Sequence, residues 1–306
     1  MIGFVLEAAA VLTATTDRTT ELTVRPLTGT LGAEISGVDL GRRLDDATVA
    51  ELRALWLGYK VLFFRDQFLL PEEQVALARR FGSLTPAHPV VPGPLPALPE
   101  ILVLDSRRMR ASREYAPTRA RSREAGWHTD VTFMPTPPAG SILSAQVVPE
   151  AGGDTLWADT QAAYERLEEP VRRLVDGLTA VHDGRRVFGG FLAAGRPIRW
   201  DGEDYRDLDP VGHPVVRTHP ETLRRSLFVN PQFTSHVAGL PERDGAALLD
   251  VLYAHMTLPE VTVRHRWRAG DVAFWDNRAT MHYATLDYGD ADRVMHRVTL
   301  RGDRPA

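Results

Sequence analysis

A histidine and an aspartate lie two residues apart in the segment Trp127–Phe133, and this pair limits how the chain can fold. The segment is typical of a β-strand, in which alternate side chains share a face, so we expect His128 and Asp130 to point to the same side. An imidazole and a carboxylate suit a divalent metal, and one more histidine would complete the facial set that binds non-haem Fe(II). The pair alone also occurs by chance, so the prediction depends on a distant third ligand.

The sequence contains no cysteine, so any metal must be held by His, Asp or Glu, and disulfides and cysteine nucleophiles are excluded. This composition fits a reducing compartment, and we predict a cytoplasmic protein. The 36 basic and 40 acidic side chains leave a net charge of −4, which does not favour nucleic-acid binding. No run is long enough to span a membrane. We therefore expect neither a nucleic acid nor a membrane as partner.

The first 21 residues differ from the rest of the chain. The apolar segment Ile2–Leu12 superficially resembles a secretory signal, but no Lys or Arg precedes it and Glu7 interrupts it. We predict a flexible N-terminal extension over residues 1–21. Residues 22–306 show no internal repeat and no linker, so we predict that they form a single domain.

Short apolar and β-branched runs recur through this domain and predict many strands with a few helices. The run Lys60–Arg65 is apolar at every position between its charged ends, as is typical of a strand covered on both faces. Other strands are predicted at 22–24, 34–38, 101–105, 141–148, 215–218, 226–230, 261–267, 271–275 and 294–300. Helices are predicted at 47–59, 71–81, 160–167, 170–178 and 241–255. This order indicates a mostly β protein with flanking helices and a double-stranded β-helix core, the jelly-roll or cupin-like fold, with the metal in its mouth.

Three segments are predicted to be irregular. Residues 85–100 contain six prolines, and residues 185–213 mix Gly, Pro, Asp and Arg without a clear period. Residues 107–124 contain seven arginines. That segment is either a solvated mobile loop or a lid over an anionic substrate, and the sequence leaves both interpretations open.

His282 is the candidate for the third ligand. Histidines inside regular elements, such as His255 in a predicted helix, are more often structural than metal-binding. His282 instead follows a strand that breaks at Asp276-Asn277, and it precedes Arg293 and Arg297 at the head of the last strand. These arginines share one face if that strand is regular, and guanidinium groups bind carboxylates or sulfonates through paired hydrogen bonds.

With these residues, the sequence resembles the taurine dioxygenase (TauD/TfdA) family of Fe(II)- and 2-oxoglutarate-dependent dioxygenases from about Leu22 to Asp303. The similar blocks, in family order, are Trp127–Phe133, Gly152–Trp157, His213–Pro220, Phe228–Asn230, Trp275–Thr280 and Met295–Arg297. The resemblance implies an oxidoreductase with Fe(II) as cofactor and 2-oxoglutarate and O2 as cosubstrates. It also implies a homo-oligomer, either a dimer or a tetramer.

The resemblance assigns roles by position. It implies that His128, Asp130 and His282 are the iron ligands. It implies further that Thr155 and Arg293 bind the distal carboxylate of 2-oxoglutarate, whose keto-acid end chelates the iron. Oxidative decarboxylation would then yield succinate and CO2 while a nearby C–H bond of the substrate is hydroxylated.

The resemblance also suggests a small anionic organic substrate. In relatives that cleave sulfonates and sulfate esters, residues matching Arg297 and His88 hold the anion, and Val131 and Phe233 would line the pocket. Hydroxylation next to the sulfur group would release sulfite or sulfate and an aldehyde. We therefore predict that the substrate is an alkyl sulfonate or an alkyl sulfate.

Two segments depart from the taurine enzymes. Arg121–Gly126 replaces an Asp/Asn-rich stretch, and Val90-Val91 replaces an aromatic residue, so taurine is one candidate among several. The alternative is the same chemistry on a carboxylate-bearing biosynthetic intermediate, as in a natural-product hydroxylase or desaturase. A more remote alternative is a non-catalytic metal-binding protein that senses 2-oxoglutarate.

Overall fold

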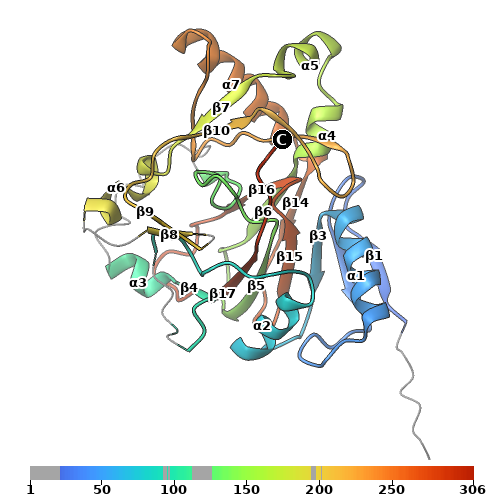
Figure 1. Ribbon diagram of the computed structural model, residues 1–306. Coiled ribbons are helices and arrows are strands. Elements are labelled where there is room, and N and C mark those ends of the chain that lie inside the picture. The colour runs from blue at the N-terminus through green and yellow to red at the C-terminus, as the bar shows by residue number, and fades with distance from the viewer. Residues whose placement is uncertain (1–20, 92–94, 96, 112–125, 194–197, 201) are drawn as a thin grey trace, which may run out of the picture.

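The computed structural model describes residues 21–91, 95, 97–111, 126–193, 198–200 and 202–306 (Figure 1). This part of the chain is mostly β-sheet with helices packed around it, as the sequence predicted. Residues 1–20 of the predicted extension 1–21 and most of the arginine-rich segment 107–124 lie outside the described residues. Among the described helices, none is long and apolar enough to cross a membrane.

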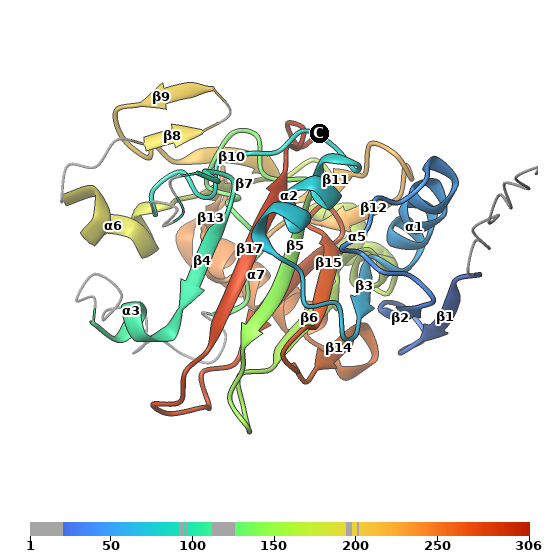
Figure 2. The ribbon, with the colours of Figure 1, turned by 90° about the horizontal axis from the view of Figure 1, so that it is seen from below.

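A seven-stranded sheet crosses the middle of the molecule (Figure 2). Its strands are, in order, β1 (Thr23–Pro26), β2 (Ala33–Ser36), β3 (Val61–Phe64), β15 (Val272–Asp276), β5 (Gly140–Val147), β17 (Val294–Leu300) and β4 (Leu102–Asp105). All neighbours are antiparallel except β2 and β3. Because β15 lies between β3 and β5, a strand from the C-terminal part of the chain pairs with strands from its N-terminal half.

The third strand shows how this sheet is buried. Val61 and Phe63 belong to the core on its inner side, whereas Leu62 and Phe64 pack in the core on its outer side. The alternation follows from the period of two in a strand. The prediction of a strand covered on both faces is therefore confirmed.

Two helices, α1 (Asp46–Tyr59) and α2 (Pro71–Arg79), cover the outer face of the sheet. Asp45 caps α1 by accepting a hydrogen bond of 2.7 Å from the backbone N–H of Thr48. The ring of Trp56 in α1 stacks on Phe274 of β15 at 4.3 Å between centroids. These contacts anchor the helix layer to the centre of the sheet.

A three-stranded sheet, β14–β6–β16, packs against the inner face (Figure 1). Its strands are β14 (Thr262–His265), β6 (Thr155–Asp159) and β16 (Thr280–Ala284). The core between the two sheets contains Phe63 and three tryptophans, Trp157, Trp267 and Trp275. The candidate site lies at one end of this space.

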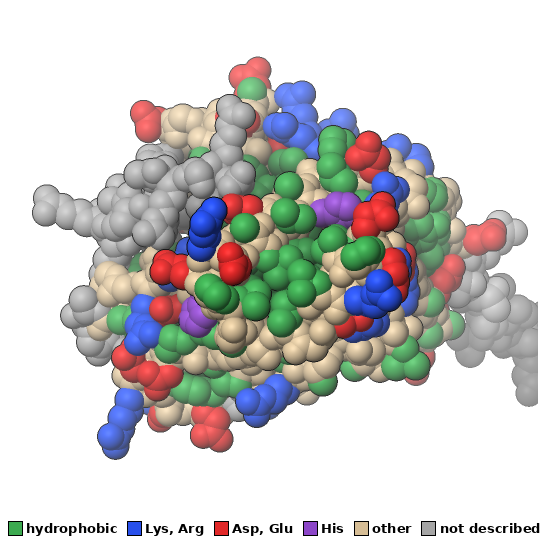
Figure 3. All heavy atoms as spheres, turned by 90° about the horizontal axis from the view of Figure 1, so that it is seen from above, with side chains coloured by type: hydrophobic (Ala, Val, Ile, Leu, Met, Phe, Trp, Pro, Cys, Tyr) green, Lys and Arg blue, Asp and Glu red, His purple; other side chains and the backbone are tan. Residues whose placement is uncertain are grey.

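The remaining helices and short strands lie around the two sheets (Figure 1). They are α3 (Ser106–Ala111), α4 (Thr160–Glu165), α5 (Glu169–Val175), β7 (Thr179–His182), α6 (Arg185–Ala193), β8 (Ile198–Trp200), β9 (Glu203–Tyr205), β10 (Val211–Pro214), β11 (Val216–Thr218), β12 (Arg225–Leu227), β13 (Thr234–Val237), α7 (Glu242–Met256) and a 3-10 turn at Pro259–Val261. Seen from above, this face gathers hydrophobic side chains between charged ones (Figure 3).

The prediction of an irregular segment at 185–213 was wrong, because α6 and the strands β8 to β10 form there. Phe188 and Phe191 of α6 and Trp200 of β8 are buried together with Phe133 and Phe233. These contacts join segments far apart in the chain, so the local pattern of hydrophobic residues does not predict them. The arginine-rich segment also begins inside α3, and β7, β13 and β16 were not predicted.

Candidate metal centre and its cavity

The two histidines of the predicted metal site face each other across an isolated antiparallel bridge. The backbone N–H of His128 donates to the carbonyl of His282 at 2.9 Å, and the reverse hydrogen bond measures 2.7 Å. Directly paired residues have adjacent side chains, and the ring centroids are 4.2 Å apart. Strand β16 thus brings the distant histidine to the segment that carries the first one.

Asp130 completes the set, but the backbone that positions it is a turn and not the strand that the sequence predicted. The segment Trp127–Phe133 is not a continuous strand, because after the bridge at His128 it turns, and Val131 has a φ of 55°. The carbonyl of Val131 then accepts a hydrogen bond from Met134 at 3.0 Å. One ligand atom each of His128, Asp130 and His282 nevertheless lies within 4.8 Å of the others.

The protonation states suit a metal. Burial lowers the pKa of both His128 and His282, so each ring is neutral near pH 7 and keeps a lone pair for coordination. Burial acts to raise the pKa of Asp130, but the charge of Arg297, together with His282, His128 and the hydrogen bond from Ser141, outweighs it and holds the pKa below its usual range. Two neutral imidazoles and one carboxylate match the donor set that Fe(II) takes in this geometry.

The orientation of His128 also fits a ligand. Its Nδ1 lies 2.9 Å from the carbonyl of Gly126, and a carbonyl can only accept, so Nδ1 carries the proton and Nε2 is free to coordinate. A metal-bound histidine commonly makes this type of contact with its other nitrogen. In His282, the buried Nδ1 has no hydrogen-bond partner among the described residues.

All nine residues predicted for the site line one cavity of about 1090 Å³. They are His88, His128, Asp130, Val131, Thr155, Phe233, His282, Arg293 and Arg297. These residues come from separate segments between positions 88 and 297, so only the tertiary fold brings them together. The volume accommodates both a dicarboxylate and an organic substrate.

Thr155 and Arg293 form one polar end of the cavity. The hydroxyl of Thr155 accepts a hydrogen bond from Trp267 Nε1 at 2.9 Å, which leaves its own proton free to donate. Arg293 donates through Nε to the carbonyl of Gly153 at 3.1 Å, while its Nη2 is buried without a partner among the described residues. Unused donors on a buried cation and a hydroxyl fit a carboxylate.

His88 and Arg297 provide a second group of donors. His88 Nδ1 accepts hydrogen bonds from the backbone N–H groups of Val90 and Val91 at 3.1 and 3.0 Å, so Nε2 carries the proton. Burial lowers the pKa of His88 to about 3, helped by the charge of Arg297. The ring is therefore a neutral donor. Arg297 is paired with Asp130 through Nη1.

Apolar side chains form the wall beside the metal-type residues. The ring of Phe233 lies edge-on to His128 at 6.1 Å, and it packs on Phe133 at 4.9 Å. Val131 is buried in the same cluster. Such a wall limits the access of water to the site and favours a substrate with an apolar part.

The structure adds residues that the sequence did not indicate. Ser141 Oγ donates to Asp130 Oδ2 at 2.6 Å, and Trp267 holds the hydroxyl of Thr155. Ser141 lies within a predicted strand, where a serine gives no sign of its partner. Trp275, whose ring lies 4.9 Å from His282, belongs to one of the sequence blocks that resemble the family. That block was the only sequence signal for these additional residues.

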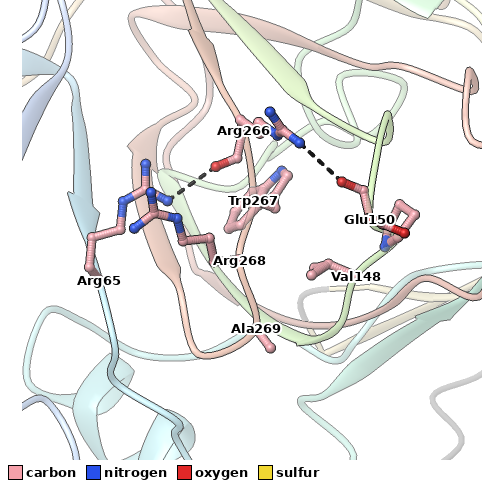
Figure 4. A pocket seen from close by; sticks show the side chains of 8 residues that line it. Arg65, Val148, Glu150, Arg266, Trp267, Arg268 and Ala269 are labelled. Atoms are coloured by element: carbon pink, nitrogen blue, oxygen red, sulfur yellow. Dashed lines mark hydrogen bonds between the residues drawn. The ribbon is translucent and has the colours of Figure 1, made fainter.

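A smaller cavity of about 530 Å³ lies at the connection between β14 and β15 (Figure 4). Arg65, Arg266 and Arg268 surround it, but Arg65 is paired with Glu34 and Asp271. Arg266 donates to the backbone carbonyl of Glu150 at 3.0 Å. This cavity contains none of the predicted site residues, so the larger one is the candidate active site.

Comparison with known proteins agrees with this geometry. The model of the family described as "Taurine catabolism dioxygenase TauD, TfdA family" matches residues 23–299. The alpha-ketoglutarate-dependent sulfate ester dioxygenase of Pseudomonas putida is 41% identical over 296 residues, covering 95% of this chain and 93% of that protein. The alkylsulfatase of Acinetobacter baylyi is 40% identical over 294 residues, covering 93% and 86%.

A solved structure is also similar. The crystal structure of a taurine dioxygenase from Burkholderia xenovorans superposes with a TM-score of 0.78 at 41% identity, covering 93% of this chain and 92% of that one. Both the fold and the sequence motifs are therefore shared with known 2-oxoglutarate-dependent dioxygenases. The family assignment made from the sequence is confirmed: this chain belongs to the TauD/TfdA family of dioxygenases.

Proposed function

We propose that this protein is an Fe(II)- and 2-oxoglutarate-dependent dioxygenase that acts on an alkyl sulfate or alkyl sulfonate. It hydroxylates the carbon next to the sulfur group, and the product then decomposes to an aldehyde and sulfate or sulfite. The single observation that carries this proposal is the convergence of metal-type residues and two separate anion-binding groups on one cavity. Relatives named for sulfate-ester and alkyl-sulfate chemistry support the choice of substrate.

In this proposal, His128, Asp130 and His282 hold the iron. When bound, iron supplies the oxidising chemistry that converts 2-oxoglutarate and O2 to succinate and CO2 while a substrate C–H bond is hydroxylated. Thr155 and Arg293 hold the distal carboxylate of 2-oxoglutarate through the donors that have no other partner. The burial of Arg293 strengthens this contact because water does not compete for it.

The substrate anion is held by His88 and Arg297. The neutral His88 offers Nε2–H, and Arg297 offers a positive charge that is otherwise paired with Asp130. Val131 and Phe233 bound the apolar part of the substrate beside the ligand His128. This arrangement orients the carbon next to the sulfur group toward the metal ligands, which favours attack at that carbon.

We propose further that the two facing sheets form a jelly-roll core, that residues 22–306 form one domain and that the protein is cytoplasmic. The continuous core between the two sheets supports the first two proposals. We also propose a homodimer or homotetramer. The apolar surface in Figure 3 supports self-association, and light scattering at several protein concentrations tests it.

The test of function is a substrate panel. The Fe(II) protein is incubated with 2-oxoglutarate, O2 and one member each of the alkyl sulfates, the alkyl sulfonates including taurine, and the aryloxy carboxylates. We expect succinate to form together with equal amounts of sulfate or sulfite from a sulfur compound. Succinate formation with the carboxylates alone would contradict the proposal and favour the biosynthetic alternative. No succinate with any member would exclude this assignment of substrate class.

A further inference from the structure

A chain of buried hydrogen bonds leads from the β15–β16 turn to the metal-binding carboxylate. Trp275 Nε1 donates to Asn277 Oδ1 at 2.9 Å, and Asn277 Nδ2 donates to Ser141 Oγ at 2.9 Å. Ser141 Oγ in turn donates to Asp130 Oδ2 at 2.6 Å. Ser141 is 0% exposed, and Trp275 and Asn277 are each 1% exposed, so water does not replace any of these contacts.

The direction of this chain is determined at both ends. An indole N–H can only donate, so the amide of Asn277 must turn its oxygen to Trp275 and its nitrogen to Ser141. The amide nitrogen also only donates, so the single proton of Ser141 is left for Asp130. At the other end, Asp130 Oδ2 lies 2.6 Å from Ser141 Oγ and accepts that proton. Each member therefore fixes the orientation of the next one.

The two oxygens of Asp130 have different neighbours. Oδ2 is held by this chain, whereas Oδ1 is contacted by Arg297. Arg297 is also the proposed ligand of the substrate anion, so its contact with Asp130 competes with substrate binding. Ser141, in contrast, is not a proposed ligand of the substrate, so substrate binding does not compete with its contact to Asp130. The carboxylate thus has one support that a substrate can remove and one that it cannot.

We propose that Ser141 and Asn277 are positioning residues that hold the Asp130 carboxylate in the orientation needed for metal binding. They act together, because Asn277 directs the proton of Ser141. Groups that orient a metal ligand typically change metal affinity by about 10- to 100-fold when removed. The inference rests on the proposed metal site, and its test measures metal binding without turnover.

The experiment measures binding of Mn(II) by titration calorimetry under anaerobic conditions, using the full chain. We expect Ser141→Ala to weaken Mn(II) binding by about 10- to 100-fold. Asn277→Leu is expected to weaken it less, since the hydroxyl can still reach Asp130 in some orientations. The double variant should bind as Ser141→Ala alone does, because linked contacts are not additive.

A matched control lies in the same strand. Ser144 is also 0% exposed, and its hydroxyl accepts a hydrogen bond of 2.8 Å from Gln146 rather than contacting a metal-type residue. Ser144→Ala should therefore leave Mn(II) affinity unchanged. At saturating Co(II), the ligand-field spectrum should change in Ser141→Ala and not in Ser144→Ala, and thermal unfolding without metal reports whether each variant is folded.

The outcomes are distinct. Ser141→Ala with an affinity within about threefold of the original protein would overturn the positioning role, as would additive effects in the double variant. If Asn277→Leu does not fold, the comparison of Ser141→Ala with Ser144→Ala still decides the role of Ser141. An original protein that binds no Mn(II) would instead refute the metal site of the proposed function.

Discussion

Arg293, directly before β17, and Arg297, within β17, are both buried and line the same cavity, yet their surroundings differ. Arg293 forms no ion pair within the described chain, and its Nη2 has no partner. Arg297 is paired with Asp130. A buried cation without a counter-charge is costly unless a ligand supplies one. We therefore propose that Arg293 binds the anion of the cosubstrate, and that Arg297 binds the anion of the substrate in competition with Asp130.

This difference matches the two anions that the proposed reaction requires, the cosubstrate and the substrate. The cosubstrate is required in every cycle, and we propose that the buried Nη2 of Arg293, which has no partner among the described residues, favours its tight binding. In this proposal, the substrate anion binds Arg297, whose charge already stabilises Asp130, so we expect substrate binding to be coupled to the metal site. Four predictions test this comparison, from the largest effect to the smallest.

The comparison depends on the proposed metal site in the same cavity. His282→Ala should reduce O2-dependent turnover of 2-oxoglutarate by on the order of a thousandfold or more, because two ligands do not hold the ion in place. His255→Ala, in α7, serves as the control and should retain activity. Succinate formation measured for both variants decides this point, and unchanged turnover in His282→Ala would refute the proposed iron site.

Arg293→Met should raise the KM for 2-oxoglutarate by roughly a hundredfold, because a buried charge-assisted contact contributes about 1.5–3 kcal/mol for each hydrogen bond. Arg268 is an exposed arginine of the smaller cavity (Figure 4), and Arg268→Met should leave this KM unchanged. Steady-state kinetics with 2-oxoglutarate varied provide the measurement. An equal rise in the KM for both variants would contradict the proposal that 2-oxoglutarate binds at Arg293.

Arg297→Lys should affect the substrate and spare the cosubstrate. Lysine keeps the charge but cannot form two parallel hydrogen bonds, so we expect the KM for an alkyl sulfate to rise roughly tenfold. The KM for 2-oxoglutarate should change by less than about twofold, since Arg293 is intact. A larger rise for 2-oxoglutarate than for the alkyl sulfate would reverse the assignment of the two arginines.

The smallest effect concerns pH. Burial holds the pKa of His88 at about 3, well below its ordinary 6.5, so the ring gains a proton only in strong acid. The contribution of His88 to anion binding should therefore stay constant between about pH 6 and 8. We expect the KM for an alkyl sulfate to vary by less than about twofold over this range. A steep fall in KM as the pH drops through 6.5 would show that a charged His88 binds the anion.

Much of the secondary structure and the identity of the site could be read from the sequence. Apolar periodicity located α1 and β3 because both are buried through regular repeats along the chain. The segment 185–213 was misjudged, since its helix and hairpin depend on packing against Phe133 and Phe233. The turn after His128 was missed for the same reason, because the residues that stabilise it lie far away in the sequence.

The sequence by itself determined which residue types are present for metal and anion binding, and its motifs identified the family. Only the tertiary structure decided how these residues share their partners. It paired Arg297 with Asp130, left Arg293 without an ion pair among the described residues and connected Trp275 to Asp130 through Asn277 and Ser141. The physical reason is that hydrogen bonds and ion pairs depend on distances of a few ångströms, which separation along the chain does not specify.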